Sequence, residues 1–393
     1  MSALLIPGIL LALLFNFVNG LNGAANSIAT VVATRTLPPF RAIVLAAVFN
    51  FLGPLLFTAA IARTLGEGIL HVDSITPSIL VVAILSSAVL LVLATISALP
   101  ISSTHTLVGG LIGAGIAIHG LQSVILPHPA VFQGLLLAIA LGAMVGVPLF
   151  FLLALTFHLP CGRTMLAGFL VGVSLSVPFL MITGFLSLSG FAVILVFIFI
   201  SPTLGFLAAF FFDILISYLF RYSHQNVRRK IFRPLQVIAS AFQATSHGAH
   251  DGQHAVAIIT TLLLVEGLIP GFFVPLWVTI ASALAIGLGT LFGGWNVIER
   301  VAKRITRIRP YQGFSASVSA GLILSTMVNA GIPVSTTHVI NGTIVGVGIT
   351  RGRSAVQWGV FRTIIAGWLI TIPLAIFVSW VLARTLGLLL PAM

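Results

Sequence analysis

Long apolar runs alternate with short polar segments along the whole chain. Most of these runs approach or exceed the roughly 20 residues that an α-helix needs to cross a bilayer. They predict membrane-embedded helices at residues 3–18, 40–62, 78–99, 132–158, 164–182, 190–220, 235–249, 272–297, 313–330 and 356–389. Because the longest runs exceed one crossing, we expect about ten to twelve embedded helices in all, some of them tilted or broken.

Four segments between these runs are too short or too polar to be ordinary crossings. They are residues 19–34, 100–119, 246–266 and 333–350, and all are rich in Gly, Ser, Thr, Asn and His. Polar, irregular backbone persists at membrane depth only where it is buried in protein or lines an aqueous cavity. We therefore expect the functional chemistry in these four segments.

Composition narrows the class of protein. Charged residues make up 6% of the chain and apolar residues 59%, whereas a soluble domain has about 25% charged residues. A soluble enzyme, a disordered chain and a disulfide-stapled secreted domain are excluded, and the long apolar runs argue against a lipid-facing β-barrel. The sequence predicts an all-α polytopic protein of the cell membrane.

Basic residues outnumber acidic ones, 18 to 6. They cluster in short loops, one cluster being Arg351, Arg353 and Arg362. Loops of this kind are held on the cytoplasmic side of a membrane. We interpret the positive charge as a determinant of topology and not as a nucleic-acid site.

Two motifs occur twice in the same order. Residues 100–105, Pro-Ile-Ser-Ser-Thr-His, recur 233 positions later as residues 333–338, Pro-Val-Ser-Thr-Thr-His. Residues 19–26 align with residues 247–254 at an offset of 228. Paired interrupted apolar segments are typical of transporters built from inverted repeats with broken or re-entrant helices. We predict a first repeat half at 1–182, connecting spans with a basic loop at 183–234, and a second half at 235–393.

The Pro-x-Ser-[Ser/Thr]-Thr-His motif is typical of a helix that begins inside the membrane. Its first N–H groups lack intrahelical partners and carry partial positive charge, so such an end binds an oxyanion without a cationic side chain. The hydroxyls of both copies add donors. The predicted anion ligands from this motif are Ser102, Ser103, Thr104, Ser335, Thr336 and Thr337.

Carboxamides and one carboxylate form a second constellation. Their oxygens can coordinate a cation, and the amides can also donate to an anion. Asp251 is the sharpest signal, because an intramembrane carboxylate is costly and functional by default. We predict Asn22, Asp251 and Gln253 as further substrate ligands. The predicted cation-coupling residues are Asp251, Asn22, Asn26, His250 and His254.

Histidine near these motifs allows proton coupling, because its charge changes near neutral pH. A zinc site is the weaker interpretation: His250, Asp251 and His254 have helical spacing, but no HExxH motif or cysteine cluster accompanies them. We expect no catalytic residues, no cofactor and no metal beyond a coupling sodium ion.

At these motifs the chain resembles the inorganic phosphate transporter (PiT) family of cation–phosphate symporters. The resemblance rests on residues 19–30, 246–253, 293–295, 312–314 and 333–338, in the family's order. It implies orthophosphate uptake driven by sodium ions or protons, inverted repeats and a homodimer in the lipid bilayer. It does not imply enzyme activity.

Three departures from the family pattern concern acidic residues. Gly23 stands where the family normally has Asp, and Ser317 stands where the family often has Glu after the motif Gln-Gly-Phe-x-Ala. Asn50 stands where some relatives have Glu. Fewer carboxylates favour protons over sodium. Sulfate, the substrate of some permeases in this superfamily, is the alternative substrate. It has no proton to donate and so needs no carboxylate as acceptor. Asp251 still offers an acceptor, so phosphate stays the first choice.

Two other classes of protein compete with a transporter. An anion channel would favour long continuous pore-lining spans over duplicated broken segments. A membrane hydrolase using Ser335 and His338 lacks the third residue and the oxyanion hole of a triad.

Overall fold

The computed structural model describes residues 2–389 except 98, 100, 157, 159, 187, 189, 190 and 294–305. Pro100 of the first motif and the end of the apolar run 272–297 therefore lie outside the described residues. In the first half of the chain the helices are α1 (Leu5–Ala33), α2 (Pro39–Leu56), α3 (Ala60–Glu67), α4 (Pro77–Ile96), α5 (Ser103–His119), α6 (Pro129–Thr156) and α7 (Cys161–Ile182). They are followed by α8 (Phe191–Leu219), α9 (Gln225–Asp251), α10 (Gln253–Val265), α11 (Leu276–Phe292), α13 (Pro310–Asn329), α14 (Thr336–Ile349) and α15 (Trp358–Leu389).

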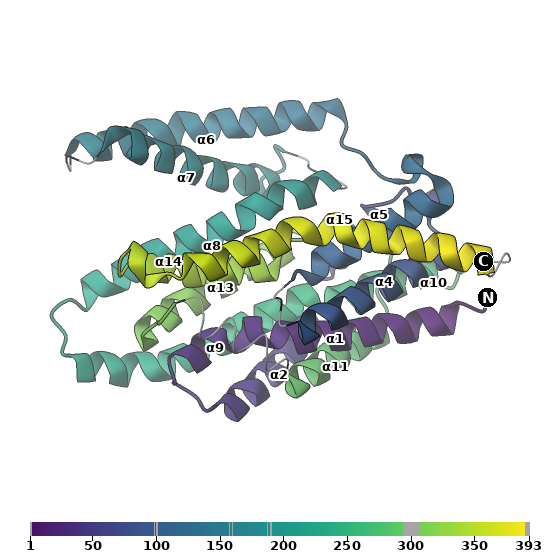
Figure 1. Cartoon of the computed structure of the whole chain (residues 1–393), viewed down its shortest axis with the longest axis horizontal. Coiled ribbons are helices and arrows are strands. Elements are labelled where there is room, and N and C mark those ends of the chain that lie inside the picture. The colour runs from purple at the N-terminus through teal and green to yellow at the C-terminus, as the bar shows by residue number, and fades with distance from the viewer. Residues whose placement is uncertain are drawn as a thin grey trace.

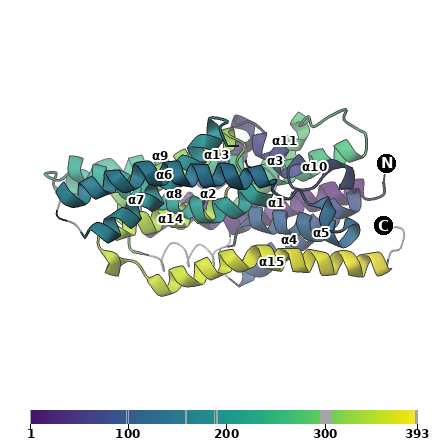
Figure 2. The same cartoon turned by 90° about the horizontal axis from the view of Figure 1, so that it is seen from above.

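The described part of the chain is an all-helical, multi-span membrane protein. Seven of its helices are long and apolar enough to cross a membrane, namely α1, α2, α4, α6, α7, α8 and α15. Figure 1 shows α6 and α7 as a hairpin on one side of the bundle, and Figure 2 shows α15 running along another side. The remaining helices are shorter or more polar, and they include both copies of the Pro-x-Ser motif.

Most predicted apolar runs correspond to helices within a few residues, but the first prediction was wrong. The polar segment 19–34 is not separate from the run 3–18, because α1 continues as one helix to Ala33. Its asparagines lie in the interior, so polarity there marks a buried face of the helix and not a chain break. The segment 246–266 is interrupted, since α9 ends at Asp251 and α10 begins at Gln253.

Two short helices, α5 and α14, each pack closely against a long apolar helix. A Cβ atom at Gly113 of α5 would collide with the Ile376 carbonyl oxygen of α15, and one at Gly342 of α14 would collide with the Pro202 carbonyl oxygen of α8. Small residues permit this close backbone approach between membrane helices. The contacts position the beginnings of α5 and α14 in the middle of the molecule.

We expect Gly113→Leu and Gly342→Leu each to lower the free energy of unfolding by about 1–3 kcal/mol, because the helix pairs must separate. Thermal unfolding of the purified protein in detergent measures this effect. Gly359→Leu is the control, since a Cβ at Gly359 meets nothing within 4 Å. Unfolding temperatures equal to that of the control would contradict this packing.

Candidate functional site

Four chain segments meet in the interior: the polar part of α1, the junction between α9 and α10, and the first turns of α5 and α14. Every residue that the sequence predicts for substrate or cation binding is buried, with at most 5% of its surface exposed. These residues are Asn22, Asn26, Ser102, Ser103, Thr104, His250, Asp251, Gln253, His254, Ser335, Thr336 and Thr337.

The short helices begin with the same cap. Ser102 Oγ accepts the backbone N–H of His105 at 3.3 Å, and Ser335 Oγ accepts that of His338 at 3.3 Å. Capping therefore occupies a lone pair of each serine. The remaining first-turn N–H groups provide the positive end of each helix.

The first helical residues of α5 and α14 both contact one carboxylate oxygen. Ser103 Oγ donates to Asp251 Oδ2 at 3.3 Å, and Thr336 Oγ1 donates to the same atom at 3.4 Å. Ser103 and Thr336 are equivalent positions of the two motif copies. The carboxylate thus occupies the place between two helix ends where an anion is favoured.

The next residues of the two motifs exchange contacts. Thr104 Oγ1 donates to the Val334 carbonyl at 3.3 Å, and Thr337 Oγ1 donates to the Ile101 carbonyl at 3.4 Å. Each hydroxyl therefore binds a carbonyl of the other motif copy, at the position two residues before the helix of that copy begins. These reciprocal bonds join the two motifs.

The same two threonines accept hydrogen bonds from equivalent positions of the other repeated motif. Asn26 Nδ2 donates to Thr337 Oγ1 at 3.0 Å. His254 Nε2 lies 3.2 Å from Thr104 Oγ1, and its Nδ1 lies 3.3 Å from the donor Nδ2 of Asn19. Because Nδ1 accepts, neutral His254 carries its hydrogen on Nε2 and donates it to Thr104.

His250 is held in one tautomer by the backbone. Its Nε2 accepts the N–H of Val334 at 3.1 Å, so the hydrogen of the neutral ring is on Nδ1. Nδ1 lies 3.0 Å from Asp251 Oδ1 and donates to it. This bond holds the second carboxylate oxygen and connects α9 to the segment that leads into α14.

His247 faces the same carboxylate from one turn earlier in α9. Its Nδ1 lies 3.2 Å from Asn50 Oδ1, an acceptor, and 3.4 Å from Ser27 Oγ, which can donate as well as accept. Asn50 is oriented by its Nδ2, which donates to Thr290 Oγ1 while that hydroxyl donates to the Ile286 carbonyl. Nε2 of His247 then faces Asp251 Oδ2 at 3.4 Å. In the neutral tautomer with its hydrogen on Nδ1, the ring sets a lone pair against that carboxylate oxygen, whereas a hydrogen on Nε2 faces it as a donor.

The absence of a side chain at Gly23 leaves the space that the His247 ring occupies beside Asp251. A Cβ atom at Gly23 would lie 2.8 Å from Cε1 and 3.0 Å from Nε2 of His247. The space that an aspartate at this position would need is therefore filled by the His247 ring. His247 is not among the predicted site residues, although its i, i+4 spacing to Asp251 places both on one helix face.

Gln253 and Asn22 make their contacts elsewhere. The Gln253 amide donates to the Thr58 and Ala249 carbonyls and accepts the N–H of Ala62, which fastens α10 to α3. Asn22 Nδ2 donates to Thr95 Oγ1 at 2.9 Å and links α1 to α4. Neither residue is among those that hydrogen-bond the Asp251 carboxylate in the described part of the chain.

Comparison with known proteins gives consistent results. A family model described as "Phosphate transporter family" matches residues 19–379. A "Probable low-affinity inorganic phosphate transporter" of Rhizobium meliloti is 36% identical over 377 residues, covering 96% of this chain and 94% of that protein. A protein of the same description from Bacillus subtilis is 32% identical, covering 95% and 96%. A solved structure titled "The sodium-dependent phosphate transporter" has the same fold, with a TM-score of 0.70, 23% identity, and coverage of 99% of this chain and 100% of that one.

We expect Thr104→Val and Thr337→Val each to lower the free energy of unfolding by about 1–3 kcal/mol, because each leaves a buried carbonyl without its donor. Thermal unfolding again measures the change. Thr385→Val is the matched control, since its exposed hydroxyl bonds only within its own helix, to the Val381 carbonyl. Equal stability of all three variants would mean that the reciprocal bonds do not hold the motifs together.

Proposed function

The chain belongs to the phosphate transporter family, and we propose that it imports inorganic phosphate by symport with a cation. Family membership makes it a multi-pass membrane transporter and not an enzyme. The observation that carries the proposal is the convergence of Ser103 and Thr336 on the carboxylate of Asp251.

In the proposed mechanism, Asp251 occupies the anion position when no substrate is bound. An entering phosphate takes over the Ser103 and Thr336 hydroxyls and the first-turn N–H groups of α5 and α14. Phosphate and the Asp251 carboxylate then lie side by side in a low-dielectric interior, where like charges repel strongly. A cation bound at Asp251 removes that repulsion, so phosphate and cation bind more tightly together than alone.

The proposed ligands follow from this mechanism. Phosphate lies between the two helix ends and contacts groups from both motif copies and from the segments around Asp251. Its proposed ligands are Ser102, Ser103, Thr104, Ser335, Thr336, Thr337, Asn22, Asp251 and Gln253. The proposed cation-coupling residues are Asp251, Asn22, Asn26, His250 and His254.

The coupling cation is a proton or a sodium ion, and different observations favour each. A charged His247 would set an Nε2–H against Asp251 Oδ2 at 3.4 Å, so this pair can carry the proton. For sodium, ligand atoms of His250, Asp251 and His254 lie within 4.8 Å of one another, and the solved structure of the same fold is titled as sodium-dependent. Nitrogen atoms are poor ligands for a hard cation, so we favour the proton.

The proposed architecture is a pair of inverted repeats, residues 1–182 and 235–393, joined by residues 183–234. The paired contacts support it, because Ser103 and Thr336, Thr104 and Thr337, and Asn26 and His254 make equivalent bonds at the repeat offsets. We further propose that the protein is a homodimer, as the resemblance to PiT transporters implies.

Sulfate is the second candidate substrate, because Asp251 is the single carboxylate among the predicted site residues. Divalent phosphate retains one hydrogen that needs an acceptor, and Asp251 supplies one. Sulfate carries no such hydrogen and would leave that acceptor without a donor. An anion channel is disfavoured by the hydrogen bonds that close the space between α5 and α14.

Asp251→Asn should reduce phosphate uptake at least about tenfold, equivalent to about 1.4 kcal/mol, because the amide can neither accept the phosphate hydrogen as a carboxylate does nor hold the cation. Uptake of labelled phosphate into proteoliposomes measures the loss. Asp213→Asn is the control: Asp213 is a buried carboxylate in α8 that accepts from Thr350, outside the proposed site. Normal uptake by folded Asp251→Asn protein would remove Asp251 from the mechanism.

Wild-type proteoliposomes should accumulate labelled phosphate when an inward proton gradient is imposed without sodium, and equal sulfate should leave the rate nearly unchanged. Accumulation that needs sodium at constant pH would assign sodium as the coupling ion. Uptake that only equilibrates phosphate under every gradient would contradict symport. Inhibition by equal sulfate to half the rate would place sulfate on a par with phosphate.

A further inference from the structure

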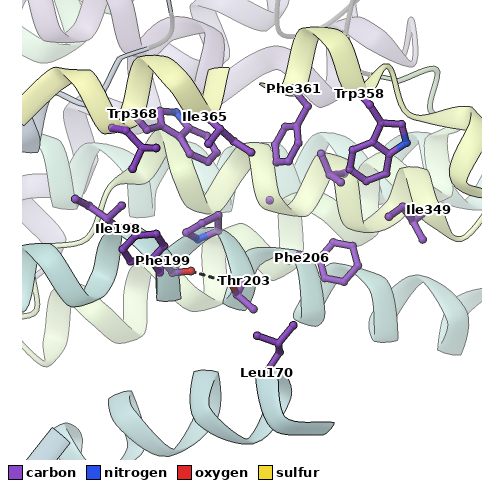
Figure 3. Close-up of a pocket in the computed structure, with 14 residues that line it drawn as sticks. Leu170, Ile198, Phe199, Thr203, Phe206, Ile349, Trp358, Phe361, Ile365 and Trp368 are labelled. Carbon is purple, nitrogen blue, oxygen red and sulfur yellow. Dashed lines mark hydrogen bonds between the residues drawn. The ribbon is translucent and has the colours of Figure 1, made fainter. Parts of the chain in front are cut away.

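An apolar cavity of about 500 Å³ lies between α7, α8, α14 and α15, apart from the Asp251 cluster (Figure 3). Its volume falls within the range of small-molecule sites in proteins. Aromatic and aliphatic side chains form nearly the whole lining, and Thr203 uses its hydroxyl within α8, donating to the Phe199 carbonyl. A polar ligand would find no partners here, so the cavity suits a hydrocarbon.

The cavity is elongated along α15. Trp358, Phe361, Ile365 and Trp368 line it at spacings of three and four residues, which is one face of the helix. Ten residues of helix span about 15 Å, which is half of the roughly 30 Å hydrocarbon core of a bilayer. Figure 3 shows Trp358 at one end of the lining and Trp368 at the other. The length and the position among membrane-spanning helices fit one lipid acyl chain in one leaflet.

Positive charge gathers at the Trp358 end. Trp358 Nε1 donates to the Arg353 carbonyl at 2.9 Å, and Arg362 lies one turn further along α15. Arg351 precedes them in the same connection, and all three arginines are exposed. Among the described residues, none of the three guanidinium groups pairs with a carboxylate, and Arg351 donates from one nitrogen to the Arg307 carbonyl. Tryptophan is enriched at the membrane–water interface, and basic pockets between membrane helices bind anionic lipid headgroups.

We propose that this cavity binds an acyl chain of an anionic phospholipid whose phosphate headgroup contacts Arg351, Arg353 and Arg362. The chain would contact α14 through Val345 and Ile349 and would contact Trp368 at the inner end. The Trp368 ring packs against that of His338, with 4.0 Å between the ring centroids and 34° between the ring planes. His338 belongs to the first turn of α14, so the bound lipid supports the helix whose beginning contacts Asp251.

Fluorescence quenching tests whether a chain enters the cavity. Trp368 is 3% exposed, whereas Trp380 on the same helix is 39% exposed and accessible to bulk lipid. Two proteins that each retain one of these tryptophans, with the other four replaced by Phe, are reconstituted in phosphatidylglycerol with brominated acyl chains. We expect comparable quenching of both. Because bulk lipid cannot reach Trp368, its quenching reports a chain inside the cavity. Quenching of Trp380 alone would mean that no chain enters and would overturn the proposal.

Two further variants separate the cavity from its surroundings. Val345→Phe fills the cavity and should abolish the quenching of Trp368 while leaving that of Trp380. The combination of Arg351→Gln, Arg353→Gln and Arg362→Gln should remove any preference of Trp368 quenching for brominated phosphatidylglycerol over brominated phosphatidylcholine. Arg229→Gln with Lys230→Gln, in exposed positions of α9, is the control and should keep that preference.

Other occupants give different results. If a second copy of this chain covers the cavity, Trp368 stays unquenched in a protein of dimeric mass and becomes quenched when the dimer dissociates, which would overturn the proposal. If free phosphate is what the arginines bind, added inorganic phosphate will abolish the headgroup preference, which would overturn the headgroup assignment. Persistence of that preference in excess inorganic phosphate supports the phospholipid.

Discussion

The rest of the structure depends on one constraint, a buried carboxylate that accepts hydrogen bonds from hydroxyl groups at two opposed helix ends. An isolated charge in a membrane interior is costly unless donors surround it. The Asp251 carboxylate accepts hydrogen bonds from Ser103, Thr336 and His250. Three chain segments, α5, α9 and α14, must therefore meet at one residue. The break between α9 and α10, the caps of α5 and α14 and the polar face of α1 all serve that meeting.

Helix packing makes the meeting geometrically possible. α5 and α14 are short, so their first turns reach the interior only because glycines let each lie directly against a long apolar helix. The reciprocal threonine bonds then set the two beginnings against each other.

The sequence predicted the all-helical membrane class, most helix positions and the residues at the two helix ends, because hydropathy and motif repetition are local signals. The sequence-based prediction failed where a polar residue can either end a helix or pack against another one, because only the folded structure shows which occurs. Polar residues 19–34 continue α1, since their partners come from other helices. Gln253 stays a predicted ligand, and its amide also fastens α10 to α3, a contact that hydropathy does not indicate. His247 is not among the predicted site residues, because its place beside the Asp251 carboxylate depends on the space at Gly23, which a single sequence does not reveal.

The most direct measurement of the central claim is an experimental structure of the protein with phosphate bound. The oxyanion should lie within hydrogen-bond distance of Ser103 Oγ and Thr336 Oγ1, with both hydroxyls no longer bonded to Asp251 and with the Asp251 carboxylate facing the bound phosphate. A phosphate found elsewhere, with Ser103 and Thr336 still donating to Asp251, would contradict the exchange of substrate for carboxylate on which the proposed symport rests.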